Sequence, residues 1–325
     1  MKILIIRFSS IGDIVLTTPI VRCIAKQIPD AEIHFICKPG YKNILEKNPY
    51  IRQLHVFDTD NRLPAETLKA EKFDYIIDLQ NNFRSKRLAQ KLGVPYAAFP
   101  KLNIKKWLLV NLNIHLLPEK HVVDRYFEAT EILPAVVEND FLGLDFFMDD
   151  LDRKKIASLH LASPFVAVAM GSQHATKQLP LPKLINICNQ LKHSIVLLGG
   201  KEDKESGDML CAAVDKDVKN LCGELSLRES AACIEQAKVL LTGDTGLMHI
   251  GSALHQNIVS VWGNTVPEFG MYPYMPQNKE KYVIIENKQL SCRPCSKLGH
   301  KKCPKKHFKC MNDIDDRQII TLLNE

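Results

Sequence analysis

The segment GDTGLMHIGSALH (243–255) places polar side chains between two apolar runs, at 238–241 and 257–263. Both runs are typical of short buried strands, and the segment after Gly246 has the composition of a helix. A helix that begins directly after a strand presents free backbone N–H groups and the positive end of its dipole. The segment therefore predicts a binding site for an anion such as a phosphate.

Four residues of this segment are candidates for that binding. Gly246 would allow close approach of the backbone to a phosphate, Thr245 would add a hydroxyl, and His249 lies one turn into the helix. Asp244 and Thr245 are equally typical of a plain helix cap, and a histidine within a helix is often a packing residue. The segment by itself leaves both interpretations open.

A second polar turn lies near the N-terminus, where SSIGD (9–13) follows the apolar run KILIIRF (2–8). It has neither the G-x-G-x-x-G pattern nor the lysine of a Walker loop, so neither nucleotide fingerprint applies. Asp13 ends this turn, and it is either a helix cap or a functional carboxylate.

Alternating strand and helix patterns are expected to position both turns. Apolar strand runs recur at 2–8, 32–37, 51–57 and 73–79, with helical patterns at 14–28, 85–93 and 121–133. After an acidic stretch near 134–160, the alternation restarts with strands at 164–170, 194–200, 238–243 and 257–263. Such alternation predicts α/β domains with parallel sheets covered on both faces. Ligands in such sheets bind beyond the carboxyl ends of the strands.

Length and composition agree with two globular domains. The chain has 325 residues, of which 46% are hydrophobic and 25% charged. No apolar run approaches the 18 residues that a membrane span needs. The N-terminal apolar run is too short for the core of a signal peptide, so we expect a cytoplasmic protein whose cysteines are mostly reduced.

The net charge of +6 is concentrated in one segment. Residues 291–310 hold seven basic side chains and no acidic one, so the other 305 residues, with 36 basic and 37 acidic side chains, sum to −1. Such a segment suits nucleic acid, an anionic membrane surface or a phosphorylated substrate, and a solvated loop is the alternative.

The same segment contains four cysteines in the pattern C-x2-C-x7-C-x6-C, namely Cys292, Cys295, Cys303 and Cys310. Together, or with a histidine in place of one cysteine, they fit a zinc site. A reduced packing cluster and disulfides are the other two interpretations. The remaining six cysteines lie in apolar runs and are expected to be small core residues.

Several of these segments together resemble glycosyltransferase family 9, the lipopolysaccharide heptosyltransferases. The N-terminal signature is RFSSIGD (7–13), followed by hydrophobic residues and TTP (17–19). DLQNNFRSKRLA and HVVDRYF resemble two acceptor-domain segments, MGSQHATKQLP the phosphate-binding loop, and LLGGKEDKE the ribose segment. GDTGLMHIGSAL with VSVWGNTVPEFGMYPY resembles the most specific signature. The likeness covers most of the chain, with the segments in the family's order.

The resemblance implies a GT-B architecture, in which two Rossmann-like domains face each other across a cleft. Residues 1–155 would bind the acceptor, and residues 156–325, with the basic Cys-rich tail, the nucleotide sugar. It implies transfer of heptose from ADP-heptose to the inner core of lipopolysaccharide, with inversion and without a metal or other cofactor. The enzyme would work peripherally at the cytoplasmic face of the inner membrane, in contact with anionic lipid, and would bind no nucleic acid.

Site residues follow from the same resemblance. Asp13 would be the general base, and Lys177 with the 244–249 turn would hold the leaving diphosphate. The candidate donor-binding residues are Lys177, Asp203, Asp244, Thr245, Gly246 and His249, and Asp203 stands where the family has a glutamate. The candidate acceptor-binding residues are Ser10, Gly12, Arg84, Lys86 and Arg125.

Three alternatives to this function remain. A family-9-like transferase could use another nucleotide sugar. A non-catalytic nucleotide-sugar-binding protein would share the fold, although Asp13 and Lys177 argue against it. A nucleic-acid-binding protein would use the tail as a zinc module, but the tail offers only Phe308 for base stacking.

Overall fold

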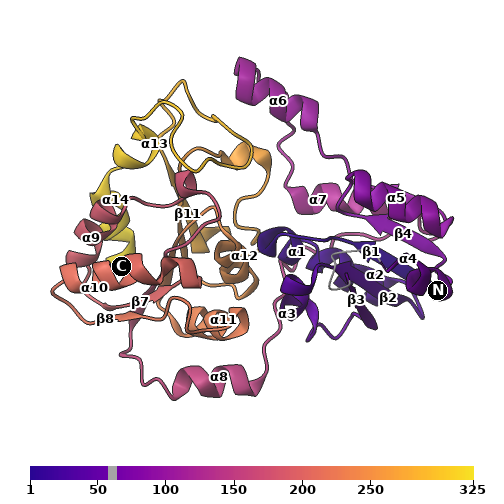
Figure 1. Ribbon diagram of the computed structural model, residues 1–325, viewed down its shortest axis with the longest axis horizontal. Coiled ribbons are helices and arrows are strands. Elements are labelled where there is room, and N and C mark those ends of the chain that lie inside the picture. Colours follow the sequence, from indigo (N-terminus) through magenta and orange to yellow (C-terminus); the bar gives the residue numbers. More distant parts are fainter. Residues whose placement is uncertain (58–63) are drawn as a thin grey trace. The chain divides into compact units, whose positions relative to one another are not determined.

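Parallel strands joined by helices build both halves of the chain (Figure 1). A computed structural model describes residues 1–57 and 64–325. The chain divides into two compact units: unit 1 comprises residues 1–102 and 120–147, and unit 2 comprises residues 103–119 and 148–325. The α/β fold class expected from the sequence is confirmed in each unit.

The described residues of unit 1 form a five-stranded parallel sheet in the order β3-β2-β1-β4-β5. Ile3 to Ile6 of β1 are fully buried, as expected for a central strand covered on both faces. The register pairs Ile3 with Ile33 and Tyr75. The strands are β1 (Lys2–Ile6), β2 (Glu32–Cys37), β3 (Gln53–Val56), β4 (Tyr75–Asp78) and β5 (Tyr96–Ala98). The helices are α1 (Ile11–Val15), α2 (Thr18–Gln27), α3 (Lys42–Leu45), α4 (Ala65–Ala70), α5 (Phe83–Leu92) and α7 (Val122–Tyr126).

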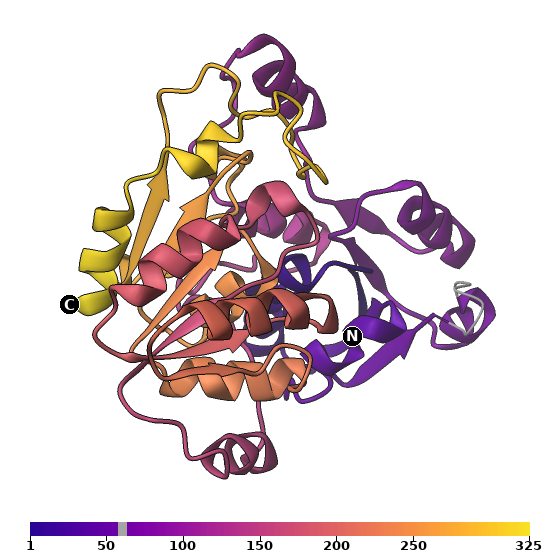
Figure 2. The ribbon, with the colours of Figure 1, turned by 60° about the vertical axis from the view of Figure 1, so that its left-hand side comes forward.

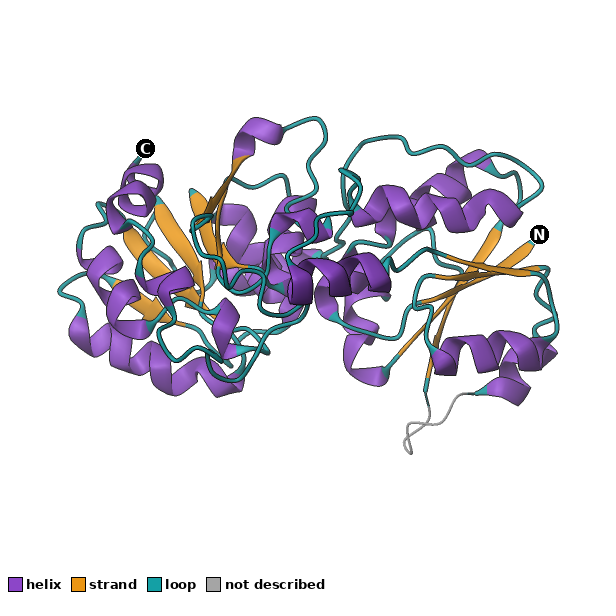
Figure 3. Ribbon diagram, turned by 90° about the horizontal axis from the view of Figure 1, so that it is seen from above, coloured by secondary structure: helices purple, strands orange, loops and turns teal. Residues whose placement is uncertain are grey.

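Unit 2, all of whose residues are described, has a six-stranded parallel sheet in the order β11-β10-β9-β6-β7-β8 (Figure 2). Its strands are β6 (Phe165–Ala169), β7 (Ser194–Leu198), β8 (Val218–Asn220), β9 (Val239–Gly243), β10 (Ile258–Trp262) and β11 (Tyr282–Glu286). Its helices are α6 (Asn103–Leu112), α8 (Asp150–Ala157), α9 (Leu181–Asn189), α10 (Lys204–Ala213), α11 (Leu227–Gln236), α12 (Gly246–Ala253), α13 (Lys309–Asn312) and α14 (Asp316–Asn324). Figure 3 shows helices on both faces of each sheet, and the apolar side chains of strands and helices form the core between them.

Three boundaries differ from the sequence expectation. The helical pattern at 14–28 is divided into α1 and α2, because Pro19 lies in the first turn of a new helix that begins at Thr18. The pattern at 121–133 forms only the short helix α7, followed by a 3₁₀ segment, Phe127–Ile132. The chain passes from unit 1 to unit 2 after residue 147 rather than 155, and residues 103–119 also belong to unit 2.

Both sheets reverse their strand order beside their first strand. From β1 the chain proceeds to β2 and β3 on one side and returns to β4 on the other side of β1. In unit 2 the chain likewise proceeds from β6 to β7 and β8 and returns to β9 beside β6. The loops after two such strands diverge to opposite faces and leave room for a ligand at their carboxyl ends. The ends of β1 and β4, and of β6 and β9, are therefore the expected positions of binding sites.

Candidate functional site

Arg7 joins the carboxyl ends of β1 and β4 in unit 1. Its side chain is buried and donates from Nη1 to the Leu79 carbonyl at 2.5 Å and from Nε to the Ser9 carbonyl at 2.9 Å. Its Nη2 lies 2.5 Å from Asp13 Oδ1. The fully buried Tyr126 lies beside Arg7, and burial raises the pKa of its phenol to about 12, so the ring stays neutral. Arg7 therefore fixes Asp13 to the end of the central strand.

Asp13 is ionised and partly open to solvent. Its side chain is 24% exposed. Its Oδ2 accepts hydrogen bonds from Ser10 Oγ at 2.7 Å and from Ser10 N at 3.2 Å. Burial acts to raise the pKa of Asp13, but the charge of Arg7 and the hydrogen bonds from Ser10 outweigh it, so the pKa is lowered from its ordinary value. Asp13 is the third residue of α1 and completes a capping box with the N-cap Ser10, so the helix-cap interpretation is confirmed. Its function as a catalytic carboxylate stays a prediction.

The other acceptor candidates lie at different depths in unit 1. Gly12 is buried in α1 beside Asp13, whereas Arg84 and Lys86 are exposed on α5. Arg125, on α7, is buried, and burial lowers its pKa. The structure thus places Ser10 and Gly12 in the Asp13 turn and shows Arg84 and Lys86 as accessible cations.

Two residues that the sequence did not single out hold the Asp13 turn. Asp78, at the end of β4, is buried and accepts hydrogen bonds from the backbone of Gln80 and Asn81 and from Ser85 Oγ. Burial raises the pKa of Asp78. Gln80 Oε1 in turn accepts from Phe8 N at 2.9 Å, directly before the turn. Their only sequence signal is the segment DLQNNFRSKRLA that contains them.

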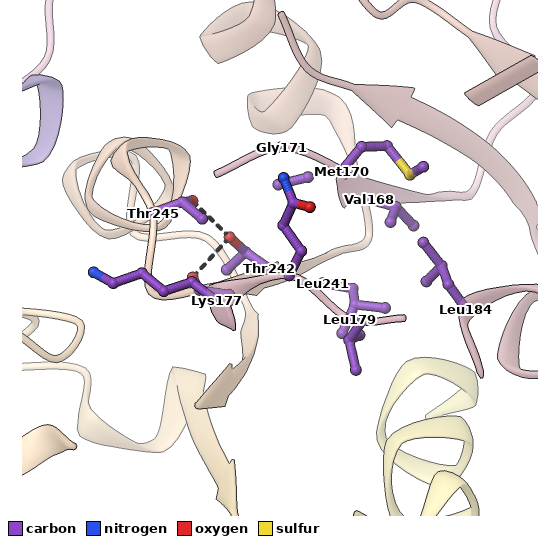
Figure 4. Close-up of a pocket in the computed structure, with 12 residues that line it drawn as sticks. Val168, Met170, Gly171, Lys177, Leu179, Leu184, Leu241, Thr242 and Thr245 are labelled. Atoms are coloured by element: carbon purple, nitrogen blue, oxygen red, sulfur yellow. Dashed lines mark hydrogen bonds between the residues drawn. The ribbon is translucent and has the colours of Figure 1, made fainter. Parts of the chain in front are cut away.

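In unit 2, polar groups meet at the carboxyl ends of β6 and β9. Lys177 Nζ lies 2.6 Å from Asp244 Oδ2, and Thr265 Oγ1 donates to the same oxygen at 2.9 Å. Asp244, as a carboxylate, cannot donate to a phosphate, and its contacts instead position the ammonium of Lys177. Figure 4 shows Lys177 and Thr245 on one side of the adjoining pocket and Leu179 and Leu184 on the other.

The helix α12 begins at this point. Thr245 is its N-cap and accepts from Met248 N at 3.4 Å, while its Oγ1 lies 3.0 Å from Thr242 Oγ1. Gly246 is the first helical residue. A side chain at Gly243 would collide with the Lys177 carbonyl, so glycine there permits the two loops to touch. A lysine beside a helix N-terminus is a suitable arrangement for a diphosphate.

Two donor candidates are largely covered. Asp203 is 8% exposed, its Oδ2 accepts from Gly200 N at 2.8 Å, and burial raises its pKa. Its carboxylate also occupies the space that side chains at Gly171 and Gly199 would fill. His249 is buried within the second turn of α12. In this structure Asp203 therefore organises the loops after β6 and β7, and the His249 side chain is not exposed to solvent.

The Cys-rich tail is attached to the lysine loop, which the sequence did not indicate. His300 N donates to Thr176 Oγ1 at 2.8 Å, and Thr176 N donates to the His300 carbonyl at 3.2 Å, directly beside Lys177. A side chain at Gly299 would collide with His174, so the contact is close. The tail therefore supports the loop that carries the candidate phosphate-binding lysine.

Arg293 is a structural residue and not part of an exposed basic patch. It is buried and pairs with Glu286 at 2.8 Å, and it donates to the Thr265 carbonyl at 2.9 Å and the Asn287 carbonyl at 2.7 Å. Because Thr265 binds Asp244, Arg293 supports the second loop of the site. The exposed cations of the tail are the six lysines Lys297, Lys301, Lys302, Lys305, Lys306 and Lys309.

All ten cysteines lie in the described part of the chain and are free thiols. Cys292 Sγ lies 3.9 Å from His307 Nε2. Burial raises the pKa of Cys295, and that of Cys310 to about 11. Among described residues, the group of His, Cys, Asp and Glu side chains whose ligand atoms all lie within 4.8 Å of one another is His34, His55 and Glu71. The four tail cysteines therefore do not converge into a ligand set in this structure.

Comparisons with known proteins identify the family and the fold type. The family model for glycosyltransferase family 9 (heptosyltransferase) matches residues 63–307. Lipopolysaccharide heptosyltransferase 2 of Escherichia coli K12 is 22% identical over 294 residues, covering 83% of this chain and 84% of that protein. The fold resembles E. coli ADP-heptose LPS heptosyltransferase II, with a TM-score of 0.74, 21% identity and coverage of 100% and 98%. It also resembles a family 9 glycosyltransferase of Veillonella parvula, with a TM-score of 0.80, 23% identity and coverage of 99% and 97%.

These structures show the fold to be of the GT-B type, and the family model spans the lysine loop, the α12 turn and most of the tail. The chain belongs to glycosyltransferase family 9 and is a glycosyltransferase.

Proposed function

We propose that the enzyme transfers a heptose from ADP-heptose to the inner core of lipopolysaccharide, with inversion at the anomeric carbon. Family membership and relatives named as heptosyltransferases support the sugar and the acceptor. The observation that carries the mechanism is Asp13, an ionised carboxylate held by Arg7 and Ser10 at the end of β1, where the strand order reverses.

In the proposed reaction, Asp13 accepts the proton of an acceptor hydroxyl as its oxygen attacks the anomeric carbon. The new C–O bond forms on the face opposite the nucleotide, and the bond to ADP breaks, with its electron pair leaving on the diphosphate. Attack from the opposite face inverts the configuration. Arg7 keeps Asp13 ionised and oriented, so the proton acceptor is present over a wide pH range.

The donor side of the proposal lies in unit 2. The diphosphate gains negative charge as it leaves, and Lys177 with the N–H groups at the start of α12 would stabilise that charge without a metal. Asp244 would position Lys177, and Thr245 and Gly246 would contact the phosphates. Asp203 remains the candidate for the ribose, acting from the loop after β7, and His249 would support the α12 turn from within the helix.

The acceptor side lies in unit 1, with Ser10 and Gly12 in the Asp13 turn. The exposed Arg84 and Lys86 would bind phosphate or carboxylate groups of the inner core, whereas the buried Arg125 would have a structural role in α7. The exposed tail lysines would add attraction to an anionic membrane surface, where a lipid-linked acceptor is located. No described helix is long and apolar enough to cross a membrane, and the proposed location is peripheral, at the cytoplasmic face of the inner membrane.

Replacing Asp13 by asparagine tests this function. We expect Asp13→Asn to lower kcat by about 10²–10⁴-fold and to leave ADP binding nearly unchanged, because the amide cannot accept the proton. Asp30→Asn, at an exposed carboxylate of the same unit, is the matched control and should keep full turnover. Near wild-type turnover of Asp13→Asn would remove Asp13 from the mechanism.

The donor sugar requires its own test, because a family-9 fold serves equally for another nucleotide sugar. Thermal unfolding in the presence of a panel of nucleotide sugars should show the largest stabilisation with ADP-heptose. A larger shift with a different sugar nucleotide would retain the chemistry and replace the donor. Binding of a sugar nucleotide without any transfer would indicate a non-catalytic binding protein.

A further inference from the structure

Helix α6 and the coil after it expose apolar side chains to solvent. Ile104, Trp107 and Leu112 of α6 are 77%, 56% and 55% exposed, and Ile114 and Leu116 in the following coil are also exposed. Leu109 is the only buried residue of this helix. Such an accumulation of large apolar side chains on a protein surface marks an interaction site.

The spacing of these residues gives the helix one apolar face. Ile104, Trp107 and Leu112 stand at positions i, i+3 and i+8, with the half-buried Leu108 at i+4 between them. That spacing places them along one side of a helix, the side that normally packs on a core. Here that side is exposed, although residues 103–119 belong to unit 2.

The charge of the segment identifies the kind of partner. Residues 100–118 contain Lys101, Lys105 and Lys106 and no acidic residue. Tryptophan is characteristic of the interface between lipid headgroups and acyl chains, and lysines beside it attract anionic headgroups. Of these lysines Lys105 is exposed, whereas Lys106 lies over the Phe269 ring. A second copy of this chain would bring the two Lys105 side chains onto one contact, which disfavours self-association through this face.

We propose that α6 with the coil to Leu116 is a membrane-docking segment that inserts its apolar face into an anionic lipid surface. The proposal rests on the proposed function, because a lipid-linked acceptor makes such docking useful to the enzyme. It differs from the contribution of the tail lysines, which attract the surface without inserting. The tail and α6 belong to the same unit.

Trp107 provides a direct readout of insertion. The chain has two tryptophans, and the other, Trp262, is 1% exposed in the core of unit 2. On addition of phosphatidylcholine vesicles that contain phosphatidylglycerol, the emission of the full-length protein should shift to shorter wavelength. Vesicles whose acyl chains carry bromine should quench the tryptophan emission. Vesicles of phosphatidylcholine alone should give a much smaller change, because the lysines contribute on the order of fivefold each on an anionic surface.

The variant Ile104→Gln/Trp107→Gln/Leu112→Gln removes the apolar face and keeps good helix formers. Each partly inserted side chain is worth about tenfold in affinity, so vesicle co-sedimentation of this variant should weaken by roughly 10²–10³-fold. The matched control Val136→Gln/Leu151→Gln/Met209→Gln removes three exposed apolar side chains elsewhere and should bind vesicles as the wild type does. Circular dichroism and thermal unfolding would show that both variants are folded.

Three outcomes would overturn the proposal. Vesicle binding without a change in Trp107 emission would show that only surface charge acts. Equal loss of binding in both variants would remove any special role of α6. A change in oligomeric state of the α6 variant without lipid would identify the face as a contact between copies. The α6 variant should transfer sugar to a water-soluble, deacylated acceptor as fast as the wild type does. If the wild type does not transfer sugar to that acceptor, the result contradicts the proposed function and leaves the docking proposal unaffected.

Discussion

Replacing Lys177 by methionine tests whether its ammonium binds the diphosphate of the donor. Lys177 Nζ lies 2.6 Å from Asp244 Oδ2, and the two side chains are only 15% and 11% exposed. Two unit charges about 4 Å apart interact by about 4 kcal/mol at an effective dielectric constant of roughly 20. Asp244 already neutralises part of the lysine charge, so we expect Lys177 to contribute about 2–3 kcal/mol to ADP binding. That corresponds to ~30–150-fold in Kd.

Titration calorimetry with ADP and with adenosine measures this contribution. Lys177→Met should weaken ADP by the factor above and adenosine by less than about threefold, because adenosine has no phosphate. In the single variant Asp244 still faces the phosphates, so adding Asp244→Asn should recover roughly tenfold of the lost affinity. Lys216→Met, at an exposed lysine of unit 2, is the control and should bind ADP normally. Equal losses for ADP and adenosine, or weaker binding by the double variant, would refute the reasoning.

Three other predictions follow from the contacts of Arg7, Arg293 and the tail. Arg7 lowers the pKa of Asp13, so Arg7→Gln should raise that pKa and move the acid limb of the kcat/KM–pH profile to higher pH. Activity of the variant should be retained best at alkaline pH. An acid limb that does not move would contradict the assignment of Asp13 as the general base. Arg293→Met leaves the buried Glu286 with only the exposed Lys288, 3.5 Å away, as an ion-pair partner. It should lower the free energy of unfolding by about 3 kcal/mol and Tm by roughly 6–12 °C. Adding Glu286→Gln should recover part of the loss, and a Tm within about 2 °C of the wild type would be inconsistent with this pair. The last variant neutralises four exposed tail lysines, namely Lys301, Lys302, Lys305 and Lys306. It should raise KM for the lipid-linked acceptor but not for the nucleotide sugar, and the effect should shrink as the salt concentration rises. An effect on KM for the nucleotide sugar would instead indicate a structural role for these lysines.

Much of the fold and of the candidate site could be predicted from the sequence, because the relevant signals are local. Apolar runs of strand length separated by helical patterns predicted parallel sheets, since strands buried on both faces have few polar residues. Asp13 and Thr245 were singled out because each stands where a strand ends and a helix begins. In the structure Asp13 completes the capping box of α1, and Thr245 is the N-cap of α12. Lys177 was located by its resemblance to a loop of the family.

Other features depended on the tertiary structure, because they join residues far apart in the sequence. The pairing of Arg7 with the Leu79 carbonyl follows from β4 lying beside β1, and the pairing of Lys177 with Asp244 follows from β9 lying beside β6. Strand order is set by the packing of whole elements, which local patterns do not report.

The composition of a segment did not show which of its individual side chains are buried. Arg293 counts in the sequence as one more basic residue of the tail, but the structure encloses it among carbonyls and Glu286. The apolar residues of α6 resemble core residues in the sequence, yet Ile104 and Trp107 are exposed. Sequence patterns tell which residues favour burial, whereas only the packing of distant elements decides which of them another surface covers.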